Sequence, residues 1–198
     1  MYLRYQPTNA LNLSISPSID WNDNSLQYVD SYTTDTENYV LGRINQVTYS
    51  ASARVNYIIT PNLSLEYWGQ PFISRGEYSD FKKVLNPGAG QFEDRYQPFS
   101  SEEISFNSLS NEYLIDEDQN GTAEFALGDP NFNFLQFRSN LVLRWEYVPG
   151  STLFVVWTSN ATDSHQSRSN EFSHLASDLG NINATNIFLI KYTYRFIL

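Results

Sequence analysis

Apolar and polar residues alternate one by one along much of the chain, so that every second side chain is apolar. In the longest regular run the apolar positions are Val47, Tyr49, Ala51, Ala53, Val55, Tyr57 and Ile59. The last stretch, 184–198, repeats the pattern with an aromatic face that holds Phe188, Ile190, Tyr192, Tyr194 and Phe196. A period of two is that of a β-strand with one apolar face, so both stretches predict strands and not helices.

The same alternation, interrupted by turn residues, predicts about eight strands. They cover 1–6, 10–20, 25–35, 39–59, 62–73, 132–148, 151–159 and 184–198. Trp21 to Asn24 and 35–38 have the composition of turns, and Pro61-Asn62 and Pro149-Gly150 predict very short turns. Several of these strands, at roughly 12 to 15 residues, are longer than the five or six residues typical of a globular sheet.

Short turns and long connections alternate along the chain. The long connections are 74–131, in which 104–106 and 113–115 predict a small hairpin, and 160–183, in which 171–179 predicts one or two helical turns. An up-and-down transmembrane barrel has this arrangement, with short turns at the periplasmic end and long loops outside the cell. We therefore expect one all-β domain over 1–198, an antiparallel up-and-down transmembrane β-barrel of about eight strands or the C-terminal part of a larger barrel.

The face opposite the apolar one carries the charged residues of the predicted strands. A charge at the bilayer midplane costs roughly 2–4 kcal/mol, so these residues are expected to point into the lumen and not toward lipid. They are Arg54, Glu66, Arg138, Arg144, Glu146, Lys191 and Arg195.

Composition narrows the classes of protein that the chain could represent. Of its 198 residues, 41% are hydrophobic and 16% aromatic, which suffices for one domain with a large apolar surface. With 22 acidic and 12 basic residues the net charge is -10, which argues against a nucleic-acid partner. The absence of cysteine excludes a disulfide framework, a thiolate metal site and a cysteine nucleophile. The mean hydropathy of only -0.42 is compatible with a barrel, because the lumen-facing residues of each strand dilute the average.

The first residues lack the basic and apolar regions of a secretory signal. A barrel requires export, so we expect this sequence to be a mature or cloned segment, or the C-terminal piece of a longer chain. The polar, weakly alternating strand at 25–35 would close a barrel poorly, which favours a larger barrel with additional strands. The segment would then have a free edge at 25–34 or 1–6, opposite the terminal strand.

The segment Asp116-Glu117-Asp118-Gln119-Asn120-Gly121 places oxygen-bearing side chains at alternate positions before a glycine. Calcium loops have this spacing, because a hard cation takes several oxygen ligands around a tight turn. The candidate ligands are Asp116, Asp118 and Asn120. Leu127 stands where an EF-hand has its bidentate glutamate, so a plain hairpin turn at Asn120-Gly121 is the alternative. No other cofactor is expected.

Candidate catalytic residues are sparse. The two histidines, His165 and His174, match no zinc motif and no nucleophile pattern, and we expect both to be exposed to solvent. The paired carboxylates Glu102 and Glu103, or Asp116 and Asp118, could in principle act as in a glycosidase, but adjacent acids in an acidic loop are usually only solvated. We therefore expect a protein without enzymatic activity.

Three runs of residues in the C-terminal half resemble a known family. They are Gly128-Asp129-Pro130-Asn131-Phe132-Asn133-Phe134, Phe137-Arg138-Ser139-Asn140-Leu141-Val142-Leu143-Arg144-Trp145-Glu146-Tyr147 and Pro149-Gly150-Ser151-Thr152-Leu153-Phe154-Val155-Val156-Trp157. Residues 116–156 and 184–198 are similar to the C-terminal region of domain of unknown function 5916, a family of outer-membrane proteins of the Bacteroidota. In that family the barrel-like region follows a domain resembling family-9 carbohydrate-binding modules, which has no counterpart in this sequence. The run Tyr192-Thr193-Tyr194-Arg195-Phe196 also resembles a C-terminal barrel-assembly signal.

The resemblance implies a location in the outer membrane of a Gram-negative bacterium. Outer-membrane lipid and the barrel-assembly machinery would be partners, with a glycan as a further partner. The first functional class is thus a pore, a carrier or a membrane anchor linked to glycan handling. The alternative is a soluble secreted β-sandwich that binds glycans through exposed aromatic residues such as Trp21 and Trp68, since a sandwich also buries one face of each strand. Strand length and the charged face favour the barrel.

Overall fold

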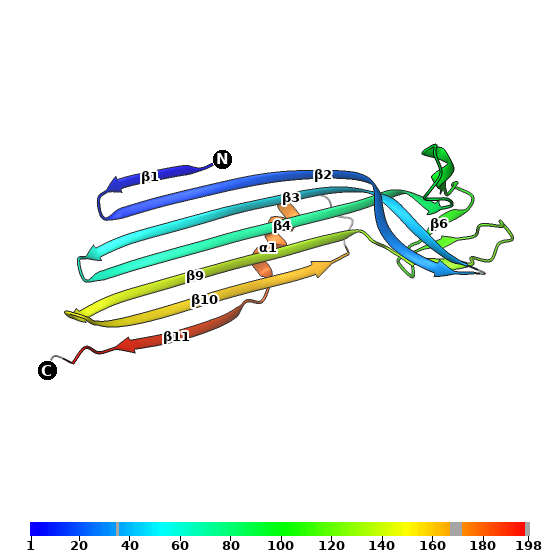
Figure 1. Cartoon of the computed structure of the whole chain (residues 1–198). Helices are drawn as coiled ribbons and strands as arrows, with labels where there is room; N and C mark the ends of the chain where they lie inside the picture. Colours follow the sequence, from blue (N-terminus) through cyan, green and yellow to red (C-terminus); the bar gives the residue numbers. More distant parts are fainter. Residues whose placement is uncertain (35, 167–171, 197–198) are drawn as a thin grey trace.

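A long antiparallel sheet dominates the computed structural model, which describes residues 1–34, 36–166 and 172–196 (Figure 1). Its strands run in the order β1 (Leu3–Thr8), β2 (Leu11–Thr33), β3 (Glu37–Thr60), β4 (Leu63–Val84), β9 (Phe132–Val148), β10 (Ser151–His165) and β11 (Thr185–Thr193). The short strand β5 (Tyr96–Pro98), which follows the 3-10 helix η1 (Glu93–Arg95), pairs with the end of β4. A second sheet contains β6 (Ile104–Asn107), β7 (Glu112–Ile115) and β8 (Phe125–Gly128), and α1 (Phe172–Asn181) precedes β11.

Each long strand pairs antiparallel with its neighbours in an up-and-down arrangement. The prediction of an all-β, antiparallel fold is therefore confirmed. Strands β1 and β11 lie at opposite edges of the sheet, and the described residues form an open sheet rather than a closed barrel (Figure 1). One free edge is formed by β1 and, beyond its end, by the part of β2 that has no partner on that side. The other free edge is β11.

The predicted turn at Trp21 to Asn24 is wrong, because these residues lie inside β2. Trp21 pairs with Val47 and Asn24 with Ile44, in the same register as the rest of the strand. The predicted strands 10–20 and 25–35 are therefore one strand, which ends at Thr33, and residue 35 lies outside the described residues. The Asn- and Asp-rich composition of 21–24 indicated a turn, but the pairing is irregular only farther along, between Asn24 and Gln27 and between Tyr28 and Asp30.

Two strands are longer than predicted, so the connections between them are shorter. β4 continues from 73 to Val84, and β10 from 159 to His165, because neighbouring strands supply pairing partners for these weakly alternating segments. The small hairpin predicted within the first connection is confirmed as β6 and β7, to which β8 adds a third strand.

The helical turns predicted at 171–179 correspond to α1. Two segments lie outside the described residues. They are 167–171, which includes Glu171 of the predicted helical turns, and 197–198 at the end of the predicted terminal strand. None of the helices in the described ranges combines the length and the apolar character that a membrane crossing needs.

The buried side chains form two small cores at different places along the sheet. One core lies where β2, β3 and β4 extend past β9 and meet the small sheet, and it contains Tyr32, Val40, Phe81 and Leu127. The other lies between α1 and the long sheet and contains Ile73, Leu135 and Leu175. Much of the long sheet therefore has its apolar side chains on the surface.

Candidate functional site

The strand register brings the apolar positions of the long sheet onto one continuous surface. Tyr57 of β3 is opposite Leu65 of β4, which is opposite Leu143 of β9. Leu143 is opposite Val155 of β10, and Val155 is opposite Ile190 of β11. Because side chains alternate along each strand, one set of positions shares this surface across the whole sheet. We call it the apolar face. It also includes Leu13, Ile15 and Ile19 of β2.

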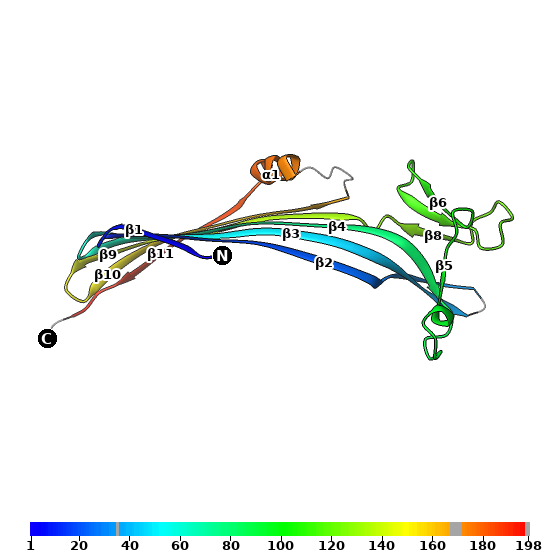
Figure 2. The same ribbon diagram turned by 90° about the horizontal axis from the view of Figure 1, so that it is seen from above.

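Large apolar side chains on this face are widely exposed. Phe188 is 73% exposed, Ile190 71%, Trp21 72% and Tyr5 66%. Among the described residues α1 is the one element that covers part of the apolar face, and the small sheet lies at the far end of the molecule (Figure 2). A protein surrounded only by water rarely has so large a contiguous apolar surface. The face is therefore suited to contact an apolar partner or medium.

Aromatic residues mark the end of the apolar face near the short turns. The Tyr147 ring stacks on Tyr192 with 5.6 Å between centroids, and Trp145 meets Tyr147 edge-on at 6.0 Å. At the opposite end of the same face stand Trp21 and Tyr49. Aromatic residues at both ends of an apolar band are typical of strands that cross a bilayer, because amphipathic rings favour the interfaces.

The predicted lumen-facing charges share the opposite face, which we call the polar face. Arg54, Glu66, Arg138, Arg144, Glu146 and Lys191 occupy the alternate positions of β3, β4, β9 and β11. Arg195 follows β11, where its backbone N–H donates to Ser151 Oγ at 2.9 Å. Its side chain covers Gly150, since a Cβ on this glycine would lie 2.5 Å from Arg195 Cδ.

Of these seven charged residues, the structure brings one pair into contact. Arg144 Nη2 lies 3.1 Å from Glu146 Oε2, and the other oxygen of Glu146 accepts the N–H of Gly150 at 2.9 Å. This pair fixes the turn between β9 and β10. Lys191 instead has its Nζ 6.0 Å from the centre of the Phe154 ring. Within the described ranges no second ion pair joins members of this set.

The polar face also holds an open cavity of about 290 Å³ beside Trp68. Its lining includes Arg54, Asn56, Glu66 and Asn140. The indole Nε1 of Trp68 donates to Ser52 Oγ at 2.9 Å, which fixes the orientation of the ring. A ring with amide and charged groups around it can bind a polar solute through both stacking and hydrogen bonds.

Toward β11 the polar face becomes apolar. Val142 and Val156 pair directly, and Leu189 of β11 continues the same row. Leu189 is 56% exposed and Ile187, two residues earlier, 61%. The terminal strand is therefore apolar on both faces over part of its length, unlike β3.

Helix α1 packs on the apolar face through a narrow stripe of side chains. Leu175 is buried against Ile73 and Leu135, and Leu179 lies at the edge of the same core. The Phe172 ring contacts that of Tyr49, with 4.9 Å between centroids. Figure 2 shows α1 as a separate layer above the long sheet.

At the other end of the molecule the small sheet packs on a continuation of the polar face. The burial of β3 alternates strictly from Asn38 to Ile44, so Val40 and Ile44 share the side of β3 that carries Thr48 and Ser50 farther along. Tyr32 stacks on Phe125 of β8 at 4.7 Å. The small sheet thus lies on the polar-face side of β3.

An ion pair links this small sheet to the long one. Lys83 Nζ of β4 lies 2.8 Å from Glu117 Oε2, and both side chains are partly buried. Burial and the nearby carboxylate of Glu124 raise the pKa of Glu117 above its ordinary value.

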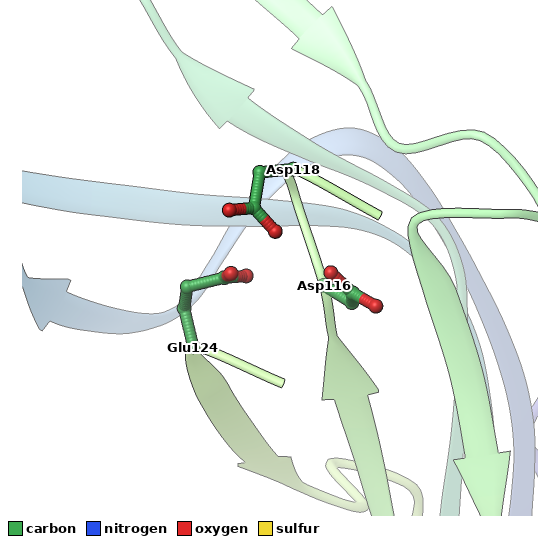
Figure 3. A group of neighbouring side chains, drawn as sticks. All are labelled: Asp116, Asp118 and Glu124. Atoms are coloured by element: carbon green, nitrogen blue, oxygen red, sulfur yellow. The ribbon is translucent and has the colours of Figure 1, made fainter. Parts of the chain in front are cut away.

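The residues predicted as calcium ligands lie together in the loop between β7 and β8. Asp116, Asp118 and Glu124 each place a carboxylate oxygen within 4.8 Å of the others (Figure 3). Glu124 was not among the predicted ligands. Asn120 belongs to the same loop, but its Nδ2 donates to Asp118 Oδ2 at 2.8 Å, so a donor and not an acceptor faces this carboxylate.

The same carboxylates also accept backbone hydrogen bonds. Asp116 Oδ2 accepts the N–H of Gly121 at 2.8 Å, and Asp118 Oδ1 accepts that of Asn120 at 3.1 Å. Gln119 and Gly121 have positive φ angles of 56° and 89°. These contacts are those of a tight turn that is satisfied by its own side chains, and three acidic groups this close could also hold a cation.

A family model matches residues 1–197. The chain belongs to the DUF5916 family, described as a domain of unknown function. The match extends beyond the two stretches in which the sequence resemblance was noted. A comparison with curated proteins gives no match, and a comparison with solved structures gives none either.

Other polar residues of this DUF5916 chain serve local structure. Glu103 Oε2 accepts the N–H of Ser100 at 2.7 Å, which holds a turn and lowers the pKa of Glu103. His165 Nδ1 lies 3.1 Å from Asp163 Oδ2 at the end of β10, and its side chain is partly buried, contrary to the expectation. His174 is exposed on α1, as expected. The two histidines therefore lie on different elements.

Two features of the DUF5916 site were not predicted from the sequence. The packing of α1 on the apolar face has a visible signal, because Phe172, Leu175, Leu179 and Ile182 are spaced as one stripe of a helix. Glu124 lies eight positions after Asp116, and only the fold of the β7–β8 loop brings the two together.

Proposed function

We propose that this DUF5916 chain forms part of the wall of a transmembrane β-barrel in the outer membrane of a Gram-negative bacterium. The apolar face would contact lipid, and the polar face would line the lumen. The proposal rests on the apolar face between the short turns and the level of Ile73 and Leu135, opposite a face that holds most of the charged residues of this span. In a membrane this division lets the apolar side chains contact lipid while the charged side chains contact water in the lumen. Beyond that level the same set of positions carries charged residues such as Arg75 and Glu77 of β4.

The height of the apolar face fits a bilayer. On β9 the apolar positions run from Leu135 to Trp145. At roughly 3.3 Å per residue this span is about 33 Å along the strand. Tilted by about 40°, it has a height of about 25 Å, which is the height of the apolar band of outer-membrane barrels.

The free edges support a barrel wall that further strands complete. In the hydrocarbon of a membrane every backbone N–H and C=O must be paired, so an exposed edge such as that of β11 is unfavourable there. The charged polar face and its cavity beside Trp68 require an aqueous space inside the barrel, and a barrel of more than eight strands leaves such a space. We therefore favour a pore or a carrier over a pure anchor.

A polar solute is the cargo that the lumen-facing side suits best. The cavity beside Trp68 combines a fixed aromatic ring with the amides of Asn56 and Asn140 and the charges of Arg54 and Glu66. This combination supports the proposed link to glycan handling, since sugars have both apolar faces and many hydroxyl groups. The alternative of a soluble β-sandwich requires a second sheet over the apolar face, and the described part of the chain has none there.

Extraction and gel migration test the proposal. The chain should partition into the membrane fraction, require detergent for extraction and migrate faster on a gel before heating than after it. A β-sandwich control protein of similar mass should remain soluble throughout. A chain that stays monomeric in buffer without detergent would overturn the barrel.

A further inference from the structure

We propose that α1 lies at the headgroup level of the membrane and that the groove between α1 and the long sheet holds one acyl chain of a membrane lipid. This inference rests on the proposed function, because it takes the apolar face to be the lipid-facing one. It adds a specific lipid site to a surface that would otherwise contact lipid without preference.

The docking of α1 fixes which of its sides faces away from the sheet. Leu175 is 2% exposed and packs with Ile73 and Leu135, so this side of the helix is closed against the apolar face. The remaining positions are exposed and mostly polar or small: Ser173, His174, Ala176, Ser177, Asp178 and Gly180. A charged residue such as Asp178 is unfavourable in hydrocarbon, so this side belongs in the polar interface.

The position of α1 along the strands agrees with this level. Its contacts are with Ile73 and Leu135, at the end of the apolar span that begins at Trp145. Because that span has a height of about 25 Å when tilted, α1 lies where the hydrocarbon of one leaflet ends and the headgroups begin. An amphipathic helix at this depth has its apolar stripe inward and its polar side among headgroups.

A groove runs beside the helix on the same face. It has a volume of about 210 Å³ and is lined by Pro17, Ile19, Tyr49, Ala51, Pro71 and Phe172. Neither proline has a rotatable side chain that could fill the space, and Ala51 is too small to do so. Phe172 forms one wall while its ring is held against Tyr49.

The chemistry of the groove favours an acyl chain over other occupants. The lining side chains are almost all apolar, so a polar solute or a water molecule would lose hydrogen bonds there. The groove is also continuous with the apolar face, which brings lipid chains to its entrance. A lipid whose headgroup lies beside the polar side of α1 would direct its chain into this space.

Photolabelling of the full chain in phosphatidylcholine vesicles tests the groove. The vesicles contain a phosphatidylcholine with a diazirine in its acyl chain, and labelled positions are mapped by mass spectrometry. The segments that contain Ala51 and Phe172 should be labelled more strongly than the segment around Ile190, which is on the same face but away from α1. Ala51→Phe should remove this excess. Val155→Phe, the matched change on β10, should leave it intact.

The outcomes separate the two claims. Strong labelling around Ile190 without any excess at Ala51 and Phe172 would overturn the acyl-chain site and leave the barrel standing. No labelling around Ile190 would overturn the barrel itself. In a parallel sample treated with a bifunctional cross-linker, cross-links between two chains at the groove would show a second copy as its occupant, which also overturns the lipid site.

The depth of α1 has an independent test, because the chain contains no cysteine that would compete for a label. A nitroxide is attached to Ser177→Cys, with Ile190→Cys and Leu109→Cys as hydrocarbon and water references. Collisions with oxygen and with a nickel chelate should place the label on residue 177 between the two references. A label that behaves like that on residue 109, or like that on residue 190, would contradict the interfacial position.

Discussion

Leu175 of α1 and Leu135 of β9 belong to one buried cluster, although 40 positions separate them in the sequence and their exposed fractions are only 2% and 0%. This contact holds a helix on a face of the sheet that is otherwise open. The dependence of α1 on so few buried side chains makes its docking sensitive to single substitutions.

We expect Leu175→Ala to release α1 from the sheet while the long strands remain folded. Replacing a buried leucine by alanine costs about 2–5 kcal/mol. We expect this loss to exceed the free energy that holds α1 on the sheet, because few buried side chains contribute to the contact. Hydrogen exchange of the α1 amides should become much faster, with no change in β3. Leu109→Ala is the control, because Leu109 is 97% exposed. Unchanged protection of α1 in Leu175→Ala would contradict the docking contact.

The two faces of β9 should respond oppositely to a change of polarity. Leu143→Lys places a charge on the apolar face, where it costs roughly 2–4 kcal/mol near the bilayer midplane, whereas Arg144→Leu removes a charge from the polar face. The yield of folded, heat-modifiable protein should fall far more for Leu143→Lys. Leu143→Ile controls for the loss of the leucine shape. Equal yields of the two charge variants would mean that the assignment of faces is wrong.

The environment of Glu117 makes the attachment of the small sheet dependent on pH. The ion pair with Lys83 favours the charged carboxylate, but burial and Glu124 outweigh it and raise the pKa, so the folded form binds a proton more readily than the unfolded one. The stability of the small sheet should therefore increase as the pH falls from the raised pKa of Glu117 toward its ordinary value.

Glu124→Gln should lower the pKa of Glu117, because it removes the neighbouring negative charge. The stability gain would then begin at a lower pH. A carbon-13 NMR titration of the glutamate carboxyls measures this directly, and Glu112→Gln serves as a control on the same sheet. A titration of Glu117 that does not move in Glu124→Gln would show that Glu124 has no influence on it.

Calcium should leave the small sheet unchanged. The carboxylates of Asp116 and Asp118 already accept backbone hydrogen bonds, and Asn120 presents its Nδ2 to Asp118. Thermal unfolding of the small sheet should occur at the same temperature with calcium and with a chelator. A saturable stabilisation by calcium that is lost in Asp118→Asn would show instead that the loop is a cation site.

The regular alternation of the strands was sufficient to predict the meander. It located β3, β9 and the terminal strand, because one face of each is apolar over many residues. It was not sufficient for the segment from Trp21 to Asn24, where tertiary pairing with β3 outweighs the local preference for a turn. Neither could the extension of β4 to Val84 be predicted, since its partners come from distant parts of the chain.

Only the part of the candidate site that depends on alternation within single strands could be predicted. The charged residues of each strand stand at every second position, so their shared face could be inferred from the sequence. The contact of Glu124 with Asp116 and the place of α1 on the apolar face depend on how separate segments fold together. A pattern along a strand contains no information about these distances.

A nitroxide scan of β3 from residue 50 to 58, in the full chain reconstituted in vesicles, measures whether the apolar face contacts lipid. Each position is changed to cysteine in turn, and collisions of the label with oxygen and with a nickel chelate are measured. We expect a period of two, in which Ala53, Val55 and the other positions of the apolar face favour oxygen, whereas Ser52, Arg54 and the other positions of the polar face favour the chelate. Equal access of the chelate to both sets of positions would contradict a lipid-facing surface and with it the barrel wall.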